Sequence, residues 1–202
     1  MHHRRLRRQA ALTIAAAAAG LVLTTGPVWA ITFGTPDTTG KYANVGSLVL
    51  TVPDGARFQL CTGTLIAPTV VLTASHCLVA FPEDFEISVT FDTVIDADRD
   101  GLVDDDVTLL TGTSHAHPLY ASGGANNTYD VGVVVLDAPV AGVPVAPLPQ
   151  LGVLDTKTAK SASYTAVGYG AVRSSKAGGT NSLGLGWRRE YAGQSINSVT
   201  KS

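Results

Sequence analysis

Both cysteines of this 202-residue chain lie in one stretch, CTGTLIAPTVVLTASHC, which runs from Cys61 to Cys77 and places His76 directly before the second cysteine. Two kinds of chemistry use these residue types. Thiolates and an imidazole can bind a metal ion, whereas a disulfide can fix a neighbouring histidine so that it acts as a general base. One histidine with two cysteines at this spacing fits no common zinc pattern, so the stretch favours the disulfide.

A second group of residues that could do chemistry is the acidic stretch DADRDGLVDDD, residues 96–106. Its Asp-x-Asp-x-Asp-Gly spacing is typical of calcium-binding loops, in which carboxylates project from a tight turn that a glycine such as Gly101 permits. The candidate ligands are Asp96, Asp98, Asp100 and Asp104. The EF-hand pattern is incomplete, because Val107 stands at its twelfth position and no helical pattern flanks the loop. A structural calcium ion and a solvated acidic turn are both compatible with this stretch.

The elements that must position these residues follow a targeting signal. MHHRRLRRQ is a positively charged start, AALTIAAAAAGLVLTTG is an uncharged apolar run, and PVWA carries small residues at Val28 and Ala30. This order is typical of a secretory signal peptide over residues 1–30; an uncleaved anchor is the alternative, but the apolar run is short for a membrane span. We therefore expect a secreted protein with no membrane attachment after cleavage. Export also favours pairing of Cys61 with Cys77, because cysteines outside the cytoplasm usually form disulfides.

From residue 31 onward, apolar residues come in short clusters separated by Gly, Pro, Asp and Asn, a pattern typical of an all-β domain. The expected strands cover residues 45–52, 57–66, 69–74, 86–92, 107–112, 131–137 and 162–170. No stretch after the signal keeps a helical period, and the sequence shows no internal repeat. The formal net charge of −2 provides no basic surface, so we expect no nucleic-acid partner.

The stretch around His76 resembles the chymotrypsin/trypsin-like serine protease family, in which a cysteine pair brackets the catalytic histidine in a Thr-Ala-Ala/Ser-His-Cys turn. The turn here is TASHC, residues 73–77. A disulfide beside His76 would clamp this turn and hold the imidazole in one orientation, as a general base requires. The segment NNTYDVGVVVLDAPV is similar to the family segment that supplies the acidic triad member, and Asp130 is the matching residue. The resemblance implies that Asp130 accepts a hydrogen bond from Nδ1–H of His76 and fixes its tautomer.

Three further segments resemble the family. HPLY, residues 117–120, is similar to the family sequence ahead of the aspartate, and we interpret His117 as structural. YTAVGYG, residues 164–170, is similar to the strand that opens the second barrel of the family, with Tyr169 in place of the usual tryptophan. The string ITFG is similar to the start of mature family members, whose freed amino group orders the substrate pocket. Signal peptidase itself would then release this terminus at Ile31.

The resemblance also shows what the sequence lacks. The nucleophile of the family lies in a Gly-Asp-Ser-Gly-Gly motif late in the second barrel, and no such motif occurs here. The nearest string, SGG at residues 122–124, precedes Asp130 and lacks the Gly-Asp pair, so we interpret it as a loop tip. We expect a trypsin-like peptidase domain over residues 31–202 that is incomplete at its C-terminus, with the first barrel complete and the second only begun. Alone, such a chain is expected to be proteolytically inactive and prone to aggregate through open strand edges.

The resemblance implies a secreted serine endopeptidase with a double β-barrel, acting as a monomer on protein or peptide substrates and requiring no cofactor. His76 would act as general base and then general acid, Asp130 would orient it, and a serine would form the acyl-enzyme. Many family members carry a calcium loop in this part of the first barrel, which favours a structural calcium ion at residues 96–106. The runner-up is a catalytically inactive pseudoprotease that acts as a secreted binding protein, but a binding protein needs neither His76 nor Asp130. A secreted calcium-binding β-domain without protease ancestry is the third reading, and the TASHC turn argues against it.

Overall fold

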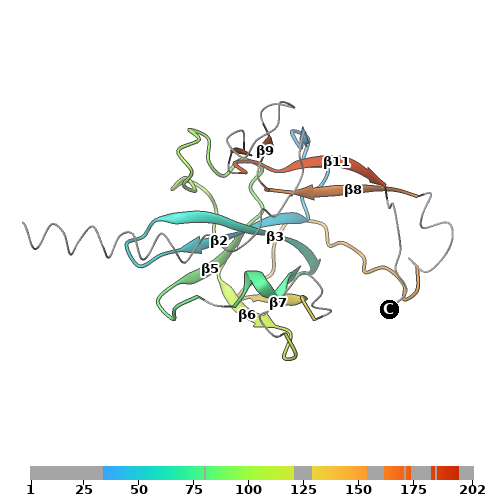
Figure 1. The fold of residues 1–202 in the computed structure, drawn as a ribbon, viewed down its shortest axis with the longest axis horizontal. Helices are drawn as coiled ribbons and strands as arrows, with labels where there is room; N and C mark the ends of the chain where they lie inside the picture. Colours follow the sequence, from blue (N-terminus) through green and yellow to red (C-terminus); the bar gives the residue numbers. More distant parts are fainter. Residues whose placement is uncertain are drawn as a thin grey trace, which may run out of the picture.

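The computed structural model describes residues 34–79, 81–120, 129–153, 162–170, 172–173, 183–184 and 186–195. The expected signal peptide, the expected mature start at Ile31 and the SGG string at residues 122–124 lie outside this part of the chain. Within the described ranges the regular structure is antiparallel β-strand apart from one short 3-10 helix, η1 (Ser75–Cys77), as Figure 1 shows. No helix in the described residues has the length and apolar character of a membrane span.

The larger sheet forms the first barrel. Its strands are β2 (Val45–Thr51), β3 (Arg57–Ala67), β4 (Val70–Thr73), β5 (Glu86–Thr90), β6 (Gly112–Ala116) and β7 (Gly132–Leu136), in the order β5-β2-β3-β4-β7-β6. All neighbouring strands are antiparallel. An isolated antiparallel pair between Val89 and Leu110 joins the two outer edges, so that the sheet curls on itself as a barrel requires.

A second, smaller set of strands lies beside the barrel. It consists of β1 (Thr35–Pro36), β11 (Glu190–Ser195) and β8 (Ser163–Gly168) in the order β1-β11-β8, together with the short pair β9 (Val172–Arg173) and β10 (Leu183–Gly184). Figure 1 shows β8 and β11 side by side along one side of the barrel. The expected fold class, an all-β double barrel with a first barrel formed and a second only partly built, is therefore confirmed.

Strand β2 is buried on both faces because an apolar core lies on each side of it. Leu48 points into the barrel, where it packs with Leu65, Val71, Cys77, Val89, Val134 and Leu136. Val49 points the other way and packs with Ile95, Val103, Val107 and Tyr169. This split follows from the strand alternation of side chains. Each such aliphatic side chain contributes about 1.5–3 kcal/mol when fully buried, so the second core holds both the acidic loop and the smaller sheet against the barrel.

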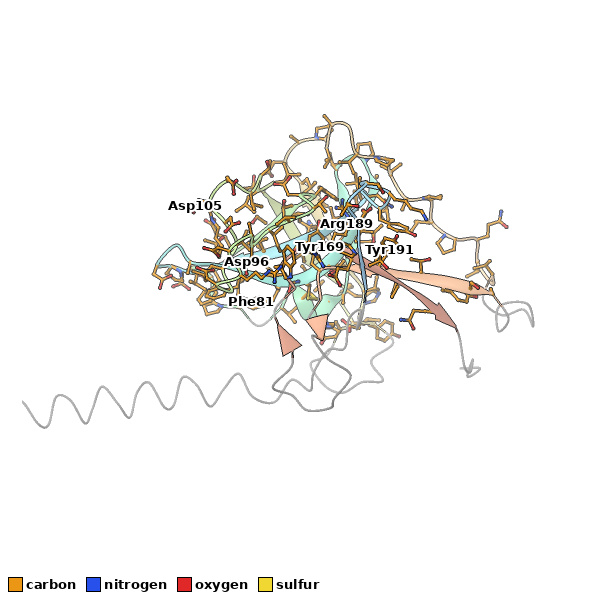
Figure 2. The ribbon with its side chains drawn as sticks, turned by 90° about the horizontal axis from the view of Figure 1, so that it is seen from above. Phe81, Asp96, Asp105, Tyr169, Arg189 and Tyr191 are labelled. Carbon is orange, nitrogen blue, oxygen red and sulfur yellow. A yellow bond between two sulfur atoms is a disulfide. The ribbon has the colours of Figure 1, made fainter. Side chains whose placement is uncertain are left out.

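Arg189 joins the smaller sheet to the barrel. Its side chain is buried, and its Nε donates to Oδ2 of Asp37 at 2.9 Å. The remaining donors go to four acceptors at 3.0 Å each: the carbonyls of Val45 and Phe91, the hydroxyl of Tyr169 and Oγ1 of Thr93. The buried charge is thus both paired and hydrogen-bonded, the two conditions under which a protein interior tolerates it. Figure 2 shows Arg189 and Tyr169 close together inside the molecule.

Tyr169 stands where the resemblance led us to expect tryptophan, and its hydroxyl explains the difference. The hydroxyl donates to the carbonyl of Asp92 at 2.5 Å while it accepts from Nη1 of Arg189. An indole N–H can donate but cannot accept, so tryptophan could not accept the hydrogen bond from Nη1 of Arg189. Burial raises the pKa of Tyr169 to about 12, and the hydroxyl therefore keeps its proton at neutral pH.

Several strands depart from the sequence-based expectation: the short β1, β9 and β10 were not expected, and two longer strands also differ. The prediction of a strand at residues 107–112 is wrong, since β6 covers Gly112–Ala116. The apolar residues that suggested the earlier position serve other contacts: Leu110 pairs with Val89, and Leu109 packs against the second core. Strand β11 was not expected, because its sequence EYAGQS has few apolar residues. It forms through backbone pairing with β8 rather than through an apolar pattern.

Candidate active site

A short 3-10 helix presents His76 at the end of β4. Ala74 is still extended, with φ −91° and ψ 146°, and η1 covers the next three residues. The backbone N–H of Cys77 donates to the carbonyl of Ala74 at 3.2 Å, which closes the turn. Ser75 and Cys77 are buried on either side of His76, whereas 47% of the His76 side chain is exposed. The turn therefore fixes the backbone of His76 and leaves its ring facing solvent.

The expected disulfide between Cys61 and Cys77 is present, with the two Cα atoms 6.2 Å apart. The disulfide ties the η1 turn to β3. In the chain-entropy model, closing a loop of this size stabilises the folded state by about 3 kcal/mol. Ligand atoms of Cys61, His76 and Cys77 lie within 4.8 Å of one another. Because the two sulfur atoms are bonded to each other, neither is a thiolate, and thiolates are what a metal site requires. Of the two chemistries that this stretch allowed, the structure contains the disulfide.

His76 and Asp130 meet through two hydrogen bonds. Nδ1 of His76 lies 2.7 Å from Oδ2 of Asp130, and the backbone N–H of His76 donates to Oδ1 at 2.9 Å. Both oxygens of one carboxylate therefore hold one residue, in its ring and in its backbone. The two residues are 54 positions apart in the chain, and the antiparallel pairing of β4 with β7 brings them together.

The electrostatics of the pair favour a charged aspartate. Partial burial on its own raises the pKa of Asp130, but hydrogen bonds from the ring and backbone of His76 outweigh it, so this pKa lies below its ordinary value of 3.8. An ionised carboxylate can only accept hydrogen bonds. The proton in the contact therefore belongs to Nδ1 of His76, which leaves Nε2 as the ring nitrogen able to accept a proton.

The residues beside Asp130 are held as well. Oγ of Ser75 donates to the carbonyl of Val131 at 2.6 Å and accepts the backbone N–H of His117 at 2.8 Å. The His117 ring stacks on Tyr129, with ring centroids 4.9 Å apart and planes 22° apart. These contacts agree with a structural role for His117. Sequence reasoning did not find the role of Ser75, because its partners are backbone atoms 56 and 42 positions away and leave no motif.

The acidic loop brings three of its four candidate ligands together. Asp96, Asp98 and Asp104 each place a carboxylate oxygen within 4.8 Å of the others. Three carboxylates form a set of hard oxygen donors, which suits calcium. The carboxylate of Asp100 instead accepts the backbone N–H of Leu102 at 2.8 Å. Figure 2 shows Asp96 toward the body of the molecule and Asp105 at its edge, in line with their burial and exposure.

The backbone of the loop holds the buried Asp96 in place. Its two oxygens accept the backbone N–H groups of Asp100 at 3.2 Å and Gly101 at 3.0 Å. Gly101 has a φ of +93°, a conformation that glycine adopts at little cost, as the motif predicts. Each carboxylate oxygen has two lone pairs, so these hydrogen bonds leave acceptor capacity for a cation. The residues present therefore fit a calcium ion.

A cavity of about 450 Å³ lies where β5 and β6 separate beyond the pair of Val89 and Leu110. Its lining combines apolar side chains, among them Leu78, Phe81 and Ile87, with the polar Thr111 and Asp137. Neither His76 nor Asp130 is part of the lining, so this cavity is separate from the candidate active site.

Comparisons with known proteins agree with this fold. The family model described as Trypsin matches residues 31–186. A curated relative named Trypsin, from Saccharopolyspora erythraea, is 34% identical over 110 residues, which cover 52% of this chain and 44% of the relative. The solved structure of HL collagenase aligns with a TM-score of 0.55 and 18% identity, and the alignment covers 81% of this chain and 62% of that chain. At this identity the structural likeness shows the fold.

The match of the family model extends over most of the chain. The chain belongs to the trypsin family. It spans less than half the length of the curated relative and 62% of the HL collagenase chain.

Proposed function

We propose that this chain carries the general-base part of a secreted trypsin-like serine endopeptidase. The observation that supports it is the contact between Nδ1 of His76 and Oδ2 of Asp130 at 2.7 Å. Nε2 of His76 accepts the proton of a serine hydroxyl as the serine oxygen attacks the peptide carbonyl, and later donates it to the leaving amine. Asp130 keeps Nδ1 protonated and stabilises the imidazolium that forms in between. The substrates are proteins or peptides, and these proton transfers need no cofactor.

The nucleophile is not assigned to a residue of this sequence, because the Gly-Asp-Ser-Gly-Gly motif does not occur in it. The proposed reaction therefore needs a serine from a polypeptide segment that bears this motif. A second candidate function is that of a pseudoprotease, a secreted protein that binds peptides without hydrolysing them. The paired His76 and Asp130 favour the endopeptidase, since binding alone uses neither proton transfer nor a fixed tautomer.

A hybrid protein tests the proposal. Residues 31–195 are joined to a C-terminal segment that bears the Gly-Asp-Ser-Gly-Gly motif of the family, and hydrolysis of peptide substrates is measured beside fluorophosphonate labelling of the serine. We expect hydrolysis by the parent hybrid and a loss of about 10⁴-fold in kcat for Asp130→Asn, with a loss at least as large for His76→Ala. His115→Ala is the matched control, because His115 is exposed on β6, and it should keep the parent rate.

Each outcome of this test separates the two candidates. Hydrolysis that survives His76→Ala contradicts the general-base assignment. The pseudoprotease is supported by a folded hybrid that binds peptides, shows no fluorophosphonate labelling of its serine and does not hydrolyse the peptides. The purified 202-residue chain without the added segment is expected to hydrolyse nothing.

Secretion and the mature terminus are part of the proposal. The charged and apolar start of the sequence and the Cys61–Cys77 disulfide support export, because disulfides persist in oxidising compartments. We further propose that signal peptidase cleaves after Ala30, that Ile31 becomes the mature terminus, and that the protein acts as a monomer. The described chain from residue 34 leads directly into β1 and so into the smaller sheet, which supports a terminus close to that sheet.

A structural calcium ion held by Asp96, Asp98 and Asp104 completes the proposal. Its charge would offset the repulsion among carboxylates that otherwise crowd one loop. The same loop supplies Val103 and Val107 to the second core, so a bound ion would also stabilise the contact between the two sheets.

A further inference from the structure

We infer that Ser75 is a positioning residue for the His76–Asp130 pair, an inference that rests on the proposed function of that pair. Ser75 is 0% exposed, and its hydroxyl uses both of its hydrogen-bonding capacities. It donates to the carbonyl of Val131 at 2.6 Å and accepts the backbone N–H of His117 at 2.8 Å. One side chain within the catalytic turn therefore binds the two segments that surround Asp130.

The location of these bonds gives Ser75 its role. Val131 directly follows Asp130, and its carbonyl also accepts the backbone N–H of His117 at 3.1 Å. Tyr129 directly precedes Asp130 and stacks on the ring of His117. Ser75 thus acts on the carboxylate indirectly, through the segments on either side of Asp130.

Loss of the hydroxyl would loosen the carboxylate relative to the ring that it orients. Alanine at position 75 removes the hydroxyl that links the turn to the segments at Val131 and His117. A misplacement of about 1 Å at a catalytic group can cost about 10²-fold in rate. The effect of Ser75 on catalysis would therefore exceed its effect on folding.

The barrel contains a serine that serves as a matched control. Ser88 on β5 is buried like Ser75, but its Oγ has no hydrogen-bond partner among the described residues. Ser88→Ala removes the same atom from the same barrel without breaking a hydrogen bond. Ser88→Ala therefore shows the effect of deleting a buried hydroxyl on its own, and a change at His76 that appears only in Ser75→Ala comes from loss of the hydrogen bonds of Ser75.

The experiment uses NMR on the purified chain and needs no catalytic activity. The two probes are the downfield resonance of the Nδ1 proton of His76 and the exchange rate of its backbone amide, which donates to Oδ1 of Asp130 at 2.9 Å. For Ser75→Ala we expect the Nδ1 resonance to broaden or move upfield and the amide to exchange about tenfold faster. Ser88→Ala should match the parent, and Ser75→Thr, which keeps the hydroxyl, should restore both probes.

The outcomes separate this inference from the proposed function. Probes in Ser75→Ala that match those in Ser88→Ala would overturn the role of Ser75 and leave the pair intact. Absence of the Nδ1 resonance from the parent, or its persistence in Asp130→Asn, would refute the pair itself and with it the proposed function. If Ser75→Ala does not fold, Ser75→Cys replaces it, because a thiol keeps the shape but donates only weakly. Unchanged probes in that variant would overturn the inference, and weakened probes would support it.

Discussion

Arg189 and Asp37 form a buried ion pair across 152 positions of the sequence, with Nε 2.9 Å from Oδ2. Only 2% of the Arg189 side chain and 0% of the Asp37 side chain are exposed. Asp37 also accepts the backbone N–H groups of Lys41 at 2.9 Å and Tyr42 at 3.0 Å. The pair joins the ends of β1 and β11, and further hydrogen bonds from Arg189 to the carbonyls of Val45 and Phe91 connect this end of the smaller sheet to the first barrel.

Removal of the arginine should destabilise the protein strongly. We expect Arg189→Ala to lower the free energy of unfolding by about 3–5 kcal/mol, because it leaves the charge of Asp37 buried without its partner. Urea unfolding followed by circular dichroism measures the loss. Arg57→Ala is the control, since the pair of Arg57 with Asp105 is longer, at 3.4 Å, and Asp105 is exposed. That variant should lose less than about 1 kcal/mol, and equal losses in the two variants would contradict the prediction.

Acid should weaken the same junction. Burial on its own raises the pKa of Asp37, but the hydrogen bonds from Arg189 and from the backbone of Tyr42 and Lys41 outweigh it, so the folded-state pKa lies below the ordinary 3.8. Asp37 therefore contributes its full stabilisation when the pH is well above the ordinary pKa of 3.8. This contribution is lost as the pH falls below that pKa and through the lower folded-state pKa. Urea unfolding at several values between about pH 2 and pH 7 should show a shallower acid dependence for Asp37→Asn than for the parent. An identical slope in both proteins would refute this assignment.

Calcium binding should be visible through Trp187. The guanidinium carbon of Arg99, which lies between Asp98 and Asp100 in the acidic loop, is 4.2 Å from the centre of the Trp187 ring. Calcium should therefore change the fluorescence of Trp187 and raise the melting temperature, with a stabilisation of about 2.7 kcal/mol at a hundredfold excess over Kd.

Two substitutions locate the ion. Asp98→Asn should abolish both calcium responses because it removes one of the three grouped carboxylates. Asp105→Asn should retain them, since Asp105 pairs with Arg57 outside that group. The site would be excluded if calcium changed neither the melting temperature nor the fluorescence of the parent protein and calorimetry detected no heat of binding.

The secreted protein should begin at Ile31. Val28 and Ala30 stand at the positions that signal peptidase reads, so cleavage should follow Ala30. N-terminal sequencing or intact-mass measurement of the protein from a culture supernatant checks this directly. Ala30→Pro should block the processing, because small residues are required at the cleavage site, and the precursor should accumulate. A terminus at another residue would refute the proposed cleavage.

The sequence was sufficient to find the His76–Asp130 pair because its signals are local. The TASHC turn and the paired cysteines are close together in the chain, and Asp130 opens an apolar strand of recognisable pattern. The all-β class was also readable, since short apolar clusters separated by turn residues predict strands. The structure adds the distance between His76 and Asp130, which no local pattern can give.

The junction around Arg189 could not be predicted in the same way. From the sequence alone, an arginine is expected at the surface. Burial of Arg189 depends on hydrogen-bond acceptors that are distant from it in the chain. Those acceptors come from segments near Asp37, Val45, Phe91 and Tyr169 that the fold alone assembles. Strand β6 escaped detection for a related reason: GTSHA has little apolar character, and its backbone pairing with β7 determines its conformation.

The pairing of Thr35 with Tyr191 and of Pro36 with Glu190 connects segments that the ribosome produces early and late. Contacts of such high sequence separation form slowly, because the entropy of closing a long loop must be overcome before the contact stabilises anything. The nascent polypeptide therefore cannot reach its final topology until nearly every residue described here has been synthesised. Until then, Thr35 and Pro36 remain without their strand partners.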